Sequence, residues 1–145
     1  MSLSAIQSRI SAQVPALHGR VFVARDLDRA VEYALSAAGD VPSAVIFDFR
    51  VSAGANEIAV GAGVRQMLTE QFTVMTCVRY SGNSAKAIDA MDTTKDAVRA
   101  ALVGWIGASA DGYPVEYVGG GIAYSDVGLM IWGDEFRSHE HLMAG

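Results

Sequence analysis

The fold is decided by the stretch Phe72-Thr73-Val74-Met75-Thr76-Cys77-Val78-Arg79-Tyr80. Its β-branched and aromatic residues alternate with a period of two, so odd-numbered and even-numbered side chains line opposite faces of a strand. We expect one long strand over residues 64–80. A polar, glycine-containing cluster follows at residues 81–84, and then apolar residues recur every three or four positions. That spacing predicts a helix over residues 85–103.

Shorter elements are expected on both sides of this pair. In chain order they are a helix over 3–14 that begins with a Ser4–Gln7 capping box and ends at Pro15, a strand over 20–24, a helix over 27–38 closed by Gly39, a strand over 44–49, a long loop over 52–63 (with or without a small strand pair), and strands over 115–124 and 129–136. The sequence therefore predicts a single α+β domain over residues 1–145, with a mostly antiparallel sheet and two to three helices packed on one face. Residues 137–145 are expected to form a flexible tail.

Composition excludes several classes of protein. The 145 residues carry 11 basic against 16 acidic side chains, a net charge of -5, which argues against a free nucleic-acid binder. The single cysteine excludes an intrachain disulfide and fits a reducing compartment. Glycines and Asp126 interrupt the apolar stretch 118–132, and the N-terminus lacks an apolar signal region. We therefore expect a soluble cytoplasmic protein.

A search for catalytic or metal-binding residues gives no constellation. His139 and His141 are two residues apart, but no further ligands accompany them, which favours a solvated tail over a metal site. The glycines at 119–121 lie between strand signals, which favours a bulge or a close backbone approach over a phosphate-binding loop. Cys77 lies within a strand, where a buried inert thiol is the usual outcome. Asp48 is interpreted as an outward-facing polar residue, and no catalytic residue, cofactor or metal is expected.

The basic residues are biased toward arginine, with nine arginines and two lysines. The guanidinium group suits ion pairs across protein interfaces, because its planar fork binds carboxylates in a bidentate manner. Arg50, Arg65 and Arg79 lie on or beside predicted strands. A genome rich in G and C would explain the same bias equally well.

Several short patterns together resemble the tail terminator family of bacteriophages and prophages, also called the minor tail U-like or tail-completion family. The patterns span residues 40–137 and are Pro42-Ser43-Ala44-Val45-Ile46, then Asn56, Gly63, Gln66, Glu70 and Phe72-Thr73-Val74, then Arg99-Ala100-Ala101-Leu102-Val103-Gly104-Trp105, and finally Tyr117-Val118-Gly119-Gly120 with Trp132 and Phe136. The family often has proline after the Gly-Trp pair, where this chain has Ile106-Gly107.

The resemblance implies a structural, non-enzymatic protein of the virion. Such proteins form a ring, usually of six copies, on the head-proximal end of the tail tube. The ring ends tube polymerisation and offers a surface to the head-completion or connector protein. DNA passes through its lumen without specific binding, no membrane is involved, and assembly takes place in the host cytoplasm.

The same resemblance turns two sequence features into interface hypotheses. The loop 52–63, with Asn56 and Glu57, would project toward a neighbouring subunit or the tube. Arg50, Arg65 and Arg79 would include intersubunit pairing residues. The alternatives are another neck or head–tail connector component, or a small ligand-binding α+β domain or enzyme, which would need a concave pocket with convergent polar groups.

Overall fold

The computed structural model describes residues 2–36, 42–79, 84–107, 109, 111–126 and 128–145. The elements follow the predicted order, with one short 3₁₀ helix added after the first helix. They are α1 (Leu3–Gln13), η1 (Pro15–Leu17), β1 (Val21–Val23), α2 (Leu27–Ser36), β2 (Ser43–Ala53), β3 (Val64–Arg79), α3 (Ser84–Leu102), β4 (Glu116–Asp126) and β5 (Leu129–Ala144). The α+β prediction is confirmed, and so are the long strand and the long helix that follows it. Gly39 and residues 80–83 lie outside the described residues.

One five-stranded sheet organises the molecule, with the strand order β1-β2-β3-β5-β4. Among the described residues, the short β1–β2 pair is parallel, and the β2–β3, β3–β5 and β4–β5 pairs are antiparallel. The predicted alternation in β3 explains its central place, because Phe72, Val74 and Val78 are buried on one face and Met75 and Cys77 on the other. A strand with two apolar faces needs cover on both.

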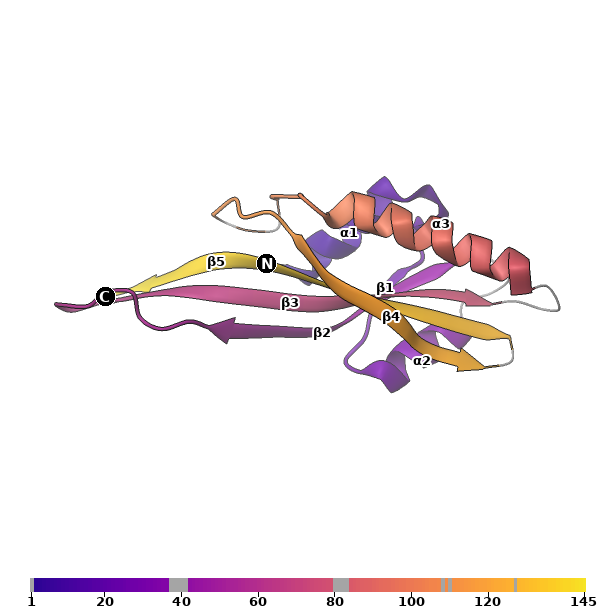
Figure 1. Cartoon of the computed structure of the whole chain (residues 1–145), viewed down its shortest axis with the longest axis horizontal. Coiled ribbons are helices and arrows are strands. Elements are labelled where there is room, and N and C mark those ends of the chain that lie inside the picture. The colour runs from indigo at the N-terminus through magenta and orange to yellow at the C-terminus, as the bar shows by residue number, and fades with distance from the viewer. Residues whose placement is uncertain (1, 37–41, 80–83, 108, 110, 127) are drawn as a thin grey trace.

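The helices supply this cover from opposite sides (Figure 1). On one face, Ile6 and Ile10 of α1 and Val98 and Leu102 of α3 form a core cluster with the sheet. On the other face, Ala30 of α2 packs with the apolar residues of the opposite side of the sheet. The prediction of two to three helices on one face therefore holds for α1 and α3, whereas α2 lies on the opposite face.

Three local expectations need correction. The side chain that caps α1 is Ser2, which accepts a hydrogen bond from the Ala5 amide, and not Ser4. β2 continues to Ala53, so the loop begins later than expected and holds no strand pair of its own. Residues 137–144 are the second half of β5 and pair with residues 71–64 of β3, where we expected a flexible tail. The backbone hydrogen bonds of this pairing are the physical reason for the difference.

Candidate functional site

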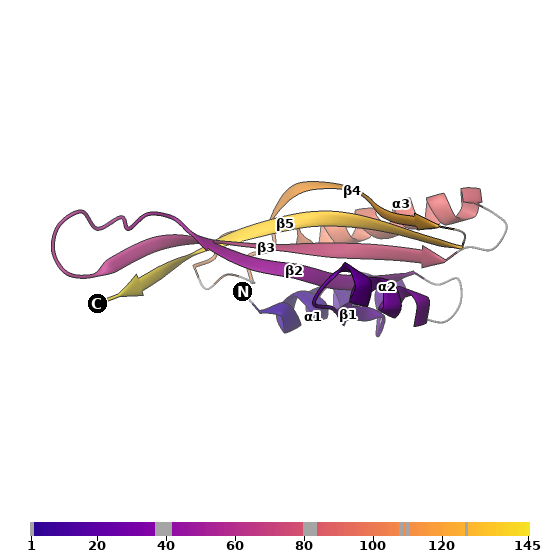
Figure 2. The ribbon, with the colours of Figure 1, turned by 90° about the horizontal axis from the view of Figure 1, so that it is seen from below.

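A three-stranded arm extends beyond the helices (Figure 2). We define the arm as residues 48–53 of β2, 64–71 of β3 and 137–144 of β5. It has three strands because β1 pairs only with residues 44–46 of β2, and β4 pairs with β5 no further than Arg137. A break in register between Phe47 and Arg50 marks its root, where Asp48 adopts a positive φ of 54°. Such bulges bend and twist a strand, which suits the point where the arm leaves the helix-covered sheet.

Asn56 organises the tip loop, residues 54–63, at the end of the arm. Its side-chain oxygen accepts hydrogen bonds from the amides of Ile58 (3.1 Å) and Arg65 (2.9 Å), and its Nδ2 donates to the Gly63 carbonyl (3.3 Å). The Gln66 side chain also donates to the Gly54 carbonyl at 2.8 Å. Asn56 thus ties both ends of the loop together, and it is a positioning residue for the loop. The Val60 side chain that the loop presents is 90% exposed.

Three of the five predicted interface residues meet at this tip. Glu57 follows Asn56, and its carboxylate pairs with Nε of Arg65 at 3.1 Å, with both side chains about half exposed. Arg50 lies near the arm root and forms two longer ion pairs, with Asp48 at 3.8 Å and Glu135 at 3.9 Å.

Arg79 lies apart from this group, at the opposite end of β3. Its Nη1 donates to the Leu35 carbonyl of α2 at 3.2 Å.

Two histidines that we expected in a solvated tail lie on one face of the arm instead. The Nδ1 of His139 lies 3.2 Å from the Thr69 hydroxyl, and the Tyr113 ring centroid is 6.0 Å from the His139 ring and 5.9 Å from that of His141. His141 lies 3.8 Å from the carboxylate of Glu57. In the part of the chain that the structure describes, no group of three or more His, Cys, Asp or Glu side chains could hold a metal ion. Both side chains are packed within the arm, with 24% of His139 and 16% of His141 exposed.

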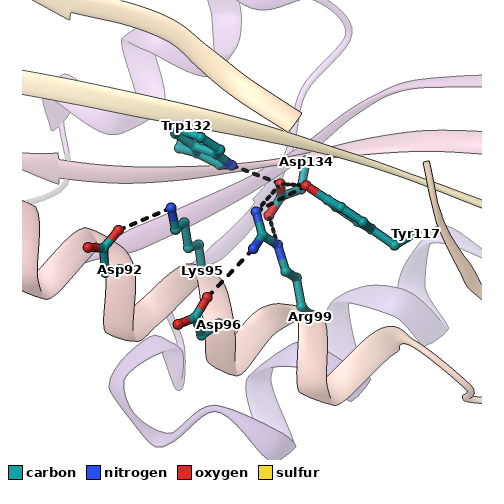
Figure 3. A network of polar contacts seen from close by, with 7 residues as sticks. All are labelled: Asp92, Lys95, Asp96, Arg99, Tyr117, Trp132 and Asp134. Atoms are coloured by element: carbon teal, nitrogen blue, oxygen red, sulfur yellow. Dashed lines mark hydrogen bonds and ion pairs between the residues drawn. The ribbon is translucent and has the colours of Figure 1, made fainter. Parts of the chain in front are cut away.

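A second polar group joins α3 to the sheet (Figure 3). This group was not predicted from the sequence. The Asp134 side chain is 2% exposed and accepts four hydrogen bonds, two from Arg99 (3.1 and 3.0 Å), one from the Tyr117 hydroxyl (2.9 Å) and one from the Trp132 indole (2.8 Å). The hydrogen bond to Asp134 raises the pKa of Arg99, and burial together with that carboxylate raises the pKa of Tyr117. The i,i+3 spacing along the predicted helix indicates only the pairs Asp92–Lys95 and Asp96–Arg99, which are present at 3.0 and 3.6 Å. Because four donors already engage Asp134, we assign this group to the fold.

The central glycines of β4 confirm the expected bulge and close backbone approach. Register shifts lie on both sides of them, between Tyr117 and Gly119 and between Ile122 and Tyr124. A Cβ atom on Gly120 would lie closer than 3.0 Å to the Asp134 carboxylate, the Tyr117 hydroxyl and the Gly133 carbonyl. Only glycine therefore fits directly above the buried carboxylate.

Two further findings bear on the class of protein. Cys77 is buried as expected, and burial raises the pKa of its thiol to about 12, which removes its nucleophilic form at neutral pH. No helix among the described residues has the length and apolar character needed to cross a membrane.

A comparison with known protein families identifies a family that matches nearly the whole chain. Residues 1–144 match the family described as "Phage tail terminator protein". No curated protein matches the chain.

Proposed function

This chain belongs to the phage tail terminator protein family, which is structural and non-enzymatic, and we propose that it closes the head-proximal end of the tail tube as a ring of six copies. In this proposal residues 1–145 act as one domain. The ring ends the polymerisation of the tube protein and presents a surface to the head-completion or connector protein.

The observation that carries the proposal is the arm. The arm extends beyond the helices (Figure 2). Ser109 and Tyr113 cover the inner part of β5, where the Ser109 hydroxyl donates to the His139 carbonyl at 2.7 Å, but the outer arm exposes the apolar side chains of Val51, Leu142 and Met143. Its tip loop is nevertheless held in one shape by Asn56, with the apolar Val60 turned outward. A preorganised apolar tip reduces the entropy that association costs, so this element is suited to contact another protein. The arm and the helix-covered body are different surfaces, and contact between different surfaces of successive copies can close a ring.

Individual charged residues of the arm are proposed as contact residues. We propose that Arg50, Arg65 and Glu57 exchange ion pairs with a neighbouring copy or with the tube, since each is about half exposed in the isolated chain. Arg79 is proposed as an interface residue on the opposite end of the sheet. Alanine at any one of these arginines is expected to weaken ring formation at least tenfold while changing the melting temperature by no more than about 4 °C, because exposed ion pairs contribute roughly 0–1 kcal/mol to folding. An equal loss of melting temperature and assembly would assign the arginine to the fold.

The charge of the chain fits the passage of DNA. With a net charge of -5, a ring of six copies would carry an excess of negative charge, which opposes tight binding of a polyanion in its lumen. The proposal thus places the protein in the assembled virion at the head-proximal end of the tail, after assembly in the host cytoplasm.

Native mass spectrometry across a concentration series tests the proposal, with negative-stain images of the same samples. We expect a closed ring of six copies that binds one end of purified tail tubes. A variant that lacks residues 56–61 should remain folded and lose both ring formation and tube binding. Intact assembly of this variant would refute the role of the tip loop. A chain that stays monomeric and does not bind tube ends, but binds connector rings, would instead favour another neck component.

A further inference from the structure

A shallow, mostly apolar groove of about 540 Å³ crosses the sheet on the face that also carries α2. Phe47, Thr73 and Met75 line its floor, with Leu27 at the start of α2 on one side and residues 118–123 of β4 on the other. The glycines of β4 keep it open, since a Cβ atom on Gly119 or Gly121 would meet nothing within 4 Å. The groove therefore offers room for side chains that this chain does not itself supply.

The charged residues that line the groove are both acidic. They are Asp48 and Glu135, whose side chains are 46% and 44% exposed. Their shared partner Arg50 lies 3.8 and 3.9 Å away, farther than the 3.1 Å of the Arg65–Glu57 pair. The groove thus favours an apolar occupant that carries a cation beside it.

The tip loop has this chemistry. Val60 is the large apolar side chain that it exposes, and its neighbours Ala59, Gly61 and Ala62 are small enough to enter a shallow groove. The guanidinium of Arg65 lies at the base of the loop and is 48% exposed. The loop and the groove are therefore complementary in apolar character and in charge.

The groove cannot receive the tip loop of its own chain. Thr73 on its floor and Val64 beside the loop belong to the same continuous strand β3. Nine residues of extended strand separate them, about 30 Å at about 3.3 Å per residue. The occupant must come from another molecule.

Building on the ring proposed above, we infer that the tip loop of one copy docks in the β4 groove of the next, with Val60 over Phe47 and Met75. Arg65 of the first copy then faces Asp48 and Glu135 of the second. Because a loop and a groove are different surfaces, each copy can give one contact and receive one, and such contacts close into a ring.

Disulfide trapping tests the contact directly. The double variant Val60→Cys with Gly121→Cys, first shown to assemble under reducing conditions, is oxidised and run on a denaturing gel. We expect a ladder of covalent oligomers up to the size of the ring, whereas each single-cysteine variant stops at a dimer. The buried Cys77 should take no part. Rings without a ladder would overturn the docking and leave the ring proposal standing, and a chain that never assembles would overturn both.

A charge exchange provides the second test. Arg65→Glu and Glu135→Arg should each lower the fraction of chains in rings at least tenfold, and the double variant should restore it. Val60→Asp should have a similar effect, while the matched control Ile106→Asp, at another exposed apolar residue, should leave the ring fraction unchanged. A normal ring fraction in Arg65→Glu, or no recovery in the double variant, would overturn the inference.

Discussion

Adjacent glycines of β4 are expected to respond in opposite ways to the same methyl group. Gly120 faces the buried Asp134, whereas Gly121 faces the open groove on the other side of the sheet. We compare Gly120→Ala with Gly121→Ala, and use Gly119→Ala as a second control. Because φ is not positive at any of the three positions, differences in backbone strain do not complicate the comparison.

The expected magnitudes come from the surroundings of each Cβ atom. On Gly120 the methyl group would overlap a carboxylate, a hydroxyl and a backbone carbonyl, so either β4 or Asp134 must move. Overpacking costs about 1–3 kcal/mol, and a buried donor that loses its acceptor costs about 1–3 kcal/mol more. We therefore expect a loss of about 3 kcal/mol for Gly120→Ala. At Gly121 the methyl group meets no atom, and the smaller entropy of the unfolded chain should stabilise the protein by about 0.5 kcal/mol.

Thermal unfolding followed by circular dichroism measures the difference. At this chain length 1 kcal/mol corresponds to about 4 °C, so the melting temperature should fall by about 12 °C in Gly120→Ala and rise by about 2 °C in Gly121→Ala. The melts are recorded at a concentration where native mass spectrometry shows monomers, because association would raise the apparent stability. Equal effects of the two substitutions would refute the assignment of Gly120 to the Asp134 network.

Three further outcomes follow from the polar groups. Asp134→Asn removes the charge that Arg99 pairs with, and urea unfolding should show a loss of about 2 kcal/mol; a loss below about 0.5 kcal/mol would contradict the role of this pair. Burial and the neighbouring Glu70 raise the pKa of Glu140, so the folded chain binds this proton more tightly than the unfolded chain, and the stability it contributes is lost as pH rises above the ordinary carboxyl range. Glu140→Gln should therefore raise the melting temperature at pH 7 and not at pH 3. A rise at pH 3 and none at pH 7 would refute the upward shift of the Glu140 pKa. Asn56→Ala should speed hydrogen exchange of the tip-loop amides at least tenfold while the melting temperature changes by less than about 4 °C, and unchanged exchange would show that the loop does not depend on this side chain.

The parts of the fold that were predictable are those with a strong period. The apolar residues of β3 recur every second position and those of α3 every three or four positions. Both elements have this strong period because β3 lies in the helix-covered part of the sheet and α3 packs on it. Within the described ranges no helix covers the arm, so the run Arg137-Ser138-His139-Glu140-His141 has no alternation of apolar and polar residues. For that reason the sequence predicted a flexible tail here. Its strand character comes from pairing with residues 64–71, more than sixty positions earlier, and sequence periodicity does not contain that register.

The residues of the candidate site also differ in how far the sequence could predict their contacts. Asn56, Glu57 and Arg65 are close in sequence, and a loop hypothesis was enough to bring them together. Arg50 and Glu135 come from strands that are not neighbours in the sheet order, so their proximity depends on the complete topology. Asp134 was missed for this reason as well, since its donors come from α3, β4 and β5.

The Asp134 group and the tip loop differ in what they could still bind in the isolated chain, and this difference separates a group that stabilises the fold from a proposed interface. The Asp134 carboxylate is buried and already has four donors, so a partner could add little to it and would have to displace a bond that stabilises the fold. The tip of the arm is the opposite case, because Asn56 fixes its shape while Val60 remains in water. Burial of that side chain by a partner gains hydrophobic free energy without the cost of ordering the loop. This combination of a fixed loop shape and an exposed apolar side chain is the reason why the tip loop, and not the Asp134 group, is proposed as the contact.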